Sequence, residues 1–214
     1  MTGGAVLAAT VHGVLLGVGL IAALGPQNVF VFQQGAVQPR LRRALPTVAT
    51  AGLADTGLVA LAVLGVSVVV LRVPWVETAL FGVGTAFLVV VGYSFLRWPA
   101  LAVDPGTEAH LGVREQVAFT AGVSLLNPHA VLDTVGVIGT SALAYDGRAR
   151  LAFAAATIAV SWTWFGGLAT AGRILGDADD AERYLGRLNA AAALVVWAVA
   201  AYTGWRFLAT LGAV

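Results

Sequence analysis

Long apolar runs fill most of the chain, and short polar stretches separate them. The first Lys, Arg, Asp or Glu is Arg40, so the opening run is free of charge and continues up to a break at Gly25-Pro26 and beyond it. A helix needs about 20 apolar residues to cross a bilayer. The pattern therefore predicts six membrane-spanning helices, at residues 4–24, 44–71, 74–96, 116–145, 151–172 and 188–207.

The six predicted helices divide into two halves of three, at residues 4–98 and 115–208, within one transmembrane domain that covers residues 1–214. Residues 99–114 form a polar linker between the halves. Each half opens with a helix that proline interrupts, and an odd number of spans places the second half upside down relative to the first. We therefore predict an all-α, polytopic membrane protein with two inverted repeats, in which helices 1 and 4 are broken.

Composition supports a membrane location. The 214 residues are 59% hydrophobic and 11% charged, whereas a soluble domain carries about 25% charged residues. The net charge of +1 leaves no broad basic surface for nucleic acid. Cysteine is absent, which excludes disulfides, thiolate metal sites and dithiol redox chemistry. The partner that composition predicts is the lipid bilayer.

The arginines give a predicted orientation. All twelve basic residues are arginine, and eight of them lie in the three connections that a six-span chain places on one side. The positive-inside rule assigns that side to the cytoplasm, so both termini are predicted to face outward. The first run lacks the positive residues that begin a secretory signal, so we expect it to stay in the protein as a membrane helix.

Two segments place proline beside polar residues at membrane depth, namely residues 24–30 and 125–134. Proline removes a helical hydrogen bond, and in hydrocarbon the freed carbonyl groups need other partners. Such breaks are tolerated only where they are buried in protein or line a wet cavity. The half-helix that follows each break presents N–H groups and a positive dipole end, which suit a carboxylate. Paired breaks in inverted halves indicate the substrate site of a secondary transporter.

Two acids lie well inside predicted spans, Asp55 and Asp133, whereas Glu77 lies in the first turn of the third span. A charged side chain at the bilayer centre costs about 2.5–3.5 kcal/mol on insertion scales, so each acid is expected to face the interior of the bundle. His129 and Asp133 are four residues apart and would share a helix face, where they could hold a proton. A buried pair that only fixes helix packing is the structural alternative. Gly13 and Gly17 predict close packing of the first helix.

The motifs resemble those of a known family. Residues 24–31 with Gln34-Gly35 resemble the GPQNAFVLRQG-type signature of the LysE/ArgO basic amino-acid exporters, and residues 126–129 with 132–134 resemble its LNPHVYLDT signature. Asp55 is similar to the acidic position of the family's second helix, and residues 161–165 to an aromatic stretch in the fifth. The similarity extends along essentially the whole chain. One departure is Gln33, where the family commonly has arginine.

The resemblance implies a transporter that exports lysine or arginine across the bacterial cytoplasmic (inner) membrane. The implied driving force is the proton gradient or the membrane potential, so protons are expected partners. No cofactor, no resident metal and no enzymatic activity are implied, and a homo-oligomer stays open. The substrate-binding residues carried over by position are Gly25, Pro26, Gln27, Asn28, Asp55, Asn127, Pro128, His129 and Asp133.

Other functions stay open on the sequence alone. A divalent metal exporter would use His129, Asp133 and Asp55 as ligands, and a transporter of neutral amino acids would share the fold. A membrane-embedded hydrolase needs a nucleophile in a recognisable setting, and none of the serines has one. A scaffold without transport would leave two buried acids beside two broken helices unexplained.

Overall fold

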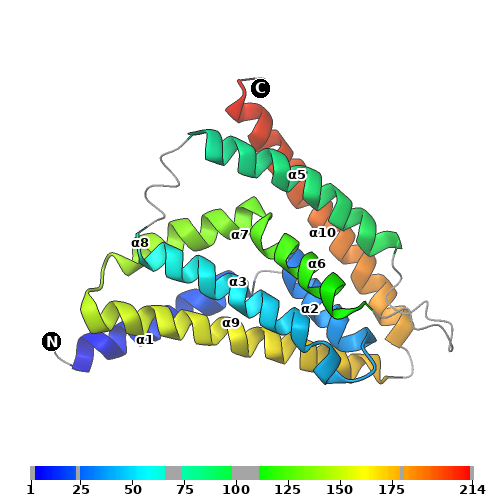
Figure 1. Ribbon diagram of the computed structural model, residues 1–214, viewed down its shortest axis with the longest axis horizontal. Coiled ribbons are helices and arrows are strands. Elements are labelled where there is room, and N and C mark those ends of the chain that lie inside the picture. The colour runs from blue at the N-terminus through cyan, green and yellow to red at the C-terminus, as the bar shows by residue number, and fades with distance from the viewer. Residues whose placement is uncertain (1–2, 23–24, 66–73, 98–110, 179–180, 213–214) are drawn as a thin grey trace.

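The computed structural model describes residues 3–22, 25–65, 74–97, 111–178 and 181–212, and all regular structure in these ranges is helical (Figure 1). Five helices are long and apolar enough to cross a membrane. They are α1 (Gly3–Ile21), α3 (Leu45–Val63), α5 (Pro74–Arg97), α9 (Gly147–Gly176) and α10 (Ala181–Thr210). The sixth crossing is a bent pair, so the predicted all-α fold with up to six spans is confirmed.

Both predicted breaks are present. The first separates α1 from α2 (Pro26–Val37), which a 3-10 turn, η1 (Leu41–Arg43), connects to α3. The second separates α6 (Val113–Leu125) from α7 (Pro128–Asp133), and the chain bends there by 61°. A π-helical turn, η2 (Thr134–Ile138), and α8 (Gly139–Ala142) then complete the bent crossing.

The first broken crossing lies along one side of α9, a helix of 30 residues and about 45 Å. Gly13 and Gly17 of α1 face the first half of α9, at Phe153 and Val160. Gly35 of α2 faces its second half, where a Cβ atom would overlap the carbonyl oxygen of Ala169. The predicted close packing at Gly13 and Gly17 is therefore confirmed, and α1 and α2 run parallel to α9.

The remaining contacts follow a regular pattern of directions. α5 and α10 are antiparallel, since Gly82 faces Phe207 and Gly92 faces Trp197. α3 is antiparallel to α9. It is parallel to the bent crossing, because its start contacts α6 and its later half contacts η2 and α8. An inverted repeat requires that the first crossing pack on α9 as the fourth packs on α3. The contacts agree with this requirement, and the repeat and its boundaries stay a prediction.

Four apolar clusters hold the helices together. One joins α2, α5, α6 and α10 around Phe30, Leu88 and Val123. A second joins α1, α3, α9 and the end of the bent crossing around Phe153, and a third joins α2, α3 and α9 around Phe165. A fourth, smaller one packs Ala36 against Leu185. The clusters surround the two breaks without filling the space between them.

The sequence placed some boundaries incorrectly. Residues 173–187 separate the fifth and sixth predicted spans, 151–172 and 188–207, but α9 continues to Gly176 and α10 begins at Ala181. A count of apolar residues does not locate these ends, because the polar turns at the end of a helix extend beyond the hydrocarbon core of the bilayer. α3 ends at Val63, two residues before Gly65, whose φ of +81° terminates a helix. The linker at residues 99–114 lies mostly outside the described residues.

Candidate functional site

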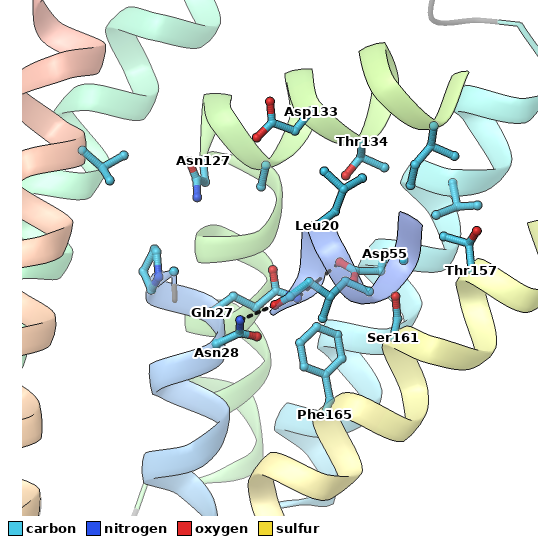
Figure 2. A pocket seen from close by; sticks show the side chains of 18 residues that line it. Leu20, Gln27, Asn28, Asp55, Asn127, Asp133, Thr134, Thr157, Ser161 and Phe165 are labelled. Atoms are coloured by element: carbon cyan, nitrogen blue, oxygen red, sulfur yellow. Dashed lines mark hydrogen bonds between the residues drawn. The ribbon is translucent and has the colours of Figure 1, made fainter. Parts of the chain in front are cut away.

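A cavity of about 290 Å³ lies where the two broken crossings meet (Figure 2). This volume is at the lower end of the range for small-molecule sites, about 300–1,000 Å³. Seven of the nine predicted site residues line it, and they come from both breaks and from α3: Gly25, Pro26, Gln27, Asn28, Asp55, Asn127 and Asp133. Residues far apart in the sequence thus bring polar groups into one pocket, whose remaining lining is largely apolar, as at Leu20, Val59 and Phe165.

The first break delivers the start of α2 to the cavity. Gly25 is the extended N-cap residue and Pro26 is the first helical residue, where a missing N–H group costs nothing. The side-chain amide of Asn28 donates a 2.6 Å hydrogen bond to the carbonyl oxygen of Ile21, at the end of α1. Asn28 therefore supplies a hydrogen-bond partner for a carbonyl group that the break has freed. The side-chain N–H group that makes this bond stabilises the fold.

Asp55 lies on α3 opposite the first break. Gln27 donates from Nε2 to the Asp55 carboxylate at 3.3 Å, which is a long hydrogen bond. The Ser161 hydroxyl of α9 faces the same carboxylate (Figure 2). The Asp55 carboxylate thus accepts a hydrogen bond from one neutral side chain, has no cationic partner among the described residues, and keeps capacity for a further donor.

The second break delivers Asn127 and Asp133. Asn127 is buried and lines the cavity, whereas Asp133 lines it and is exposed. In Figure 2 the Asp133 carboxyl group does not point at Asp55, so the two acids share the cavity without direct contact. The π-helical turn begins directly after Asp133, and such turns are frequent at functional sites.

Two predicted site residues do not line the cavity as far as the structure describes them. Pro128 is buried at the second break, where Gly84 of α5 leaves room for its ring. The side chain of His129 lies outside the described part of the chain, so its predicted pairing with Asp133 stays a prediction. The structure adds polar lining residues that were not among the predicted site residues: Thr134, Thr157 and Ser161.

A network of buried amide and hydroxyl groups lies beyond the cavity, toward the end of α2. Gln38 donates to Gln34 and to the Leu111 carbonyl at 3.1 Å each. Gln116 donates to the same carbonyl at 2.9 Å and accepts from Thr47 at 2.9 Å. This amide network joins α2, α3 and the start of α6, so it closes that end of the bundle.

The amide network lies at the arginine-rich end. Arg173 donates to the Gln38 carbonyl oxygen at 2.7 Å, and Gln33 bonds to Asn189 at the start of α10. The departure from the family pattern at Gln33 therefore lies in a contact between α2 and α10 and not in the cavity lining. The described parts of the connections that the sequence placed on one side meet at one end, at Gln38, Leu111 and Arg173, and their assignment to the cytoplasm stays a prediction.

Loss of the amide network is expected to open this end. Gln116→Ala removes two hydrogen bonds, each worth about 1 kcal/mol or less. Their loss would shift the equilibrium between the closed and open states of this end toward the open state by roughly fivefold to thirtyfold. Because the chain has no cysteine, a single cysteine at Ala130 in the cavity reports access without background. We expect faster maleimide labelling from the arginine-rich side, and an unchanged rate would contradict a closing role. Thr170→Ala, an exposed change on α9, is the control.

Comparisons with known proteins agree with this architecture. YisU of Bacillus subtilis (strain 168), named provisionally as an amino-acid transporter, is 48% identical over 92% of this chain and 89% of its own length. The arginine exporter protein ArgO of Enterobacter sp. (strain 638) is 30% identical over 88% of this chain and 90% of its own. ArgO of Pectobacterium carotovorum (strain PC1) is 31% identical over 91% of this chain and 97% of its own length.

No solved structure matches the chain significantly. The sequence profile described as LysE type translocator matches residues 18–205, which include both breaks and all the lining residues but Gly17. The resemblance inferred from the two motifs is thereby confirmed over most of the chain. The protein is a multi-pass membrane protein of the amino-acid transporter class, not an enzyme, and it belongs to the LysE family of translocators.

Proposed function

We propose that the protein is a secondary transporter that exports a basic L-amino acid, arginine or lysine, across the bacterial cytoplasmic membrane. The observation that carries the proposal is the cavity between the two breaks, which contains two carboxyl groups, Asp55 and Asp133. Its described lining residues include no arginine. Such a site favours a cation, because an unpaired buried carboxylate is costly and a cationic side chain stabilises it.

The proposed binding mode uses the two ends of the amino acid separately. The α-carboxylate would lie at the start of α2, beside Gly25 and Gln27, where the helix dipole favours negative charge. The cationic side chain would extend toward Asp55. Asn127 would offer its amide to the substrate from the opposite break.

Asp133 suits the second task that a driven exporter needs. It lines the cavity and is exposed, so it would exchange protons with water while Asp55 neutralises the substrate. The driving force would then be the proton gradient, with the membrane potential acting on the net charge moved. The exporters named among the relatives carry arginine, which supports arginine as the first substrate to test.

Inverted membrane vesicles test the proposal, because export from a cell corresponds to uptake into them. We expect uptake of labelled arginine or lysine that a proton gradient accelerates and that empty-vector vesicles lack. Labelled leucine and a divalent metal ion serve as comparison substrates. Transport of either one, with no movement of arginine or lysine, would contradict the proposal and favour another solute on the same fold.

A further inference from the structure

Ser161 stands out among the buried hydroxyl groups. Its side chain is only 1% exposed, yet its hydroxyl has no hydrogen bond of ordinary geometry to any described residue. The other five buried serines and threonines of the described residues are all hydrogen-bonded: Thr47, Thr120, Ser124, Thr157 and Thr203. An unsatisfied buried hydroxyl costs about 1–3 kcal/mol, so a buried hydroxyl of this kind that lines a cavity indicates a role in ligand binding.

Ser161 is oriented so that its hydroxyl group can reach a ligand bound in the cavity. A serine inside a helix can satisfy its hydroxyl on the carbonyl four residues before it, as Ser124 does with Thr120 at 2.8 Å. Ser161 makes no such bond, lines the cavity and faces the carboxylate of Asp55 (Figure 2). Its oxygen is therefore available to whatever Asp55 binds.

The number of donors on a cationic side chain explains why one carboxylate is not enough. A guanidinium group carries five N–H donors and an ammonium group three, and neither has an acceptor. Asp55 can accept two of them, and it already accepts one bond from Gln27. A donor buried beside Asp55 needs a further acceptor, and Ser161 of α9 faces that carboxylate (Figure 2).

We infer that Ser161 is a specificity-determining residue, whose hydroxyl oxygen accepts a hydrogen bond from the cationic end of the substrate beside Asp55. The inference rests on the proposed export of a basic amino acid. It names the part of the cavity that distinguishes a basic amino acid from a neutral one. Citrulline has nearly the shape of arginine without its charge, so it should gain much less from the pair of Asp55 and Ser161.

The test measures arginine transport in vesicles from cells that express the whole chain. Ser161→Ala removes one hydrogen bond to a charged group, so we expect the KM for arginine to rise about tenfold with little change in maximal rate. Ser161→Cys keeps the shape of the side chain with a larger terminal atom and weakens the acceptor, so it should act in the same direction. Inhibition of arginine transport by citrulline should change less than twofold.

Ser124→Ala is the matched control, since Ser124 is equally buried, is bonded within its own helix and lies outside the cavity lining. An arginine KM in both Ser161 variants that equals that of Ser124→Ala would overturn the inference. A fall in maximal rate at constant KM would also overturn it, because it would indicate a packing role. Absence of arginine and lysine transport by the unaltered protein would instead refute the proposed function.

Discussion

Asp55→Asn is expected to reduce arginine transport by about 30-fold to several thousandfold, while the protein still inserts into the membrane. The reason is the loss of a charge from a partly buried site, since truncating one member of a buried charged pair costs about 2–5 kcal/mol. Asp133→Asn is also expected to abolish export that the proton gradient drives. Initial rates of labelled arginine uptake into inverted vesicles measure both effects.

The matched control is Asp146→Asn. Asp146 is also an aspartate, but its side chain is 90% exposed and pairs only with Arg150 at 3.2 Å on the surface, so its loss should change transport by less than twofold. Expression of each variant is compared by the amount of folded protein that detergent extracts from the membrane. Unimpaired arginine transport by Asp55→Asn would remove that residue from substrate binding.

Gly35→Val is expected to prevent stable folding. The Cβ atom would overlap the backbone carbonyl of Ala169 on α9, and a backbone cannot rotate away as a side chain can. Gly172 and Gly176 of α9 face the backbone of α2 in the same way, so α2 and α9 touch along their backbones. Overpacking costs about 1–3 kcal/mol where the neighbours can shift, and more is expected here.

The measurement is the thermal unfolding of the protein in detergent, by the loss of the monodisperse peak after heating. Gly19→Val lies on the same broken crossing and meets nothing within 4 Å, so it should unfold at nearly the same temperature as the unaltered protein. Equal stability of both variants would contradict the close contact between α2 and α9.

Hydropathy sufficed for the number of crossings because bilayer thickness is a strong constraint on helix length. The breaks at Pro26 and Pro128 were also predictable, since a proline within a helix removes a hydrogen bond and clashes with the preceding turn. The ends of α9 and α10 were not, because nothing in the apolar pattern of residues 173–187 indicates that charged turns continue a helix. Their contacts with α2, such as Arg173 with Gln38, depend on the tertiary fold.

The site was predictable where its residues carry a cost in the membrane. Asp55 and Asp133 are too polar to face lipid, so their presence indicates an interior cavity. Ser161 carries no such signal, since a serine in a membrane helix normally bonds its own backbone and costs little. Only its orientation toward Asp55, which depends on how α9 packs on α3, distinguishes it. The roles of all these residues in binding stay proposals.

The central claim, that a basic amino acid binds in the cavity between the two breaks, can be tested by substrate protection. A cysteine at Ala130, which lines the cavity, is the only thiol in the chain. We predict that arginine slows its reaction with maleimide, half-maximally near the KM for transport, while a cysteine at the exposed Ala144 keeps its rate. An unchanged rate at Ala130→Cys under saturating arginine, in protein that still transports arginine, would contradict the claim.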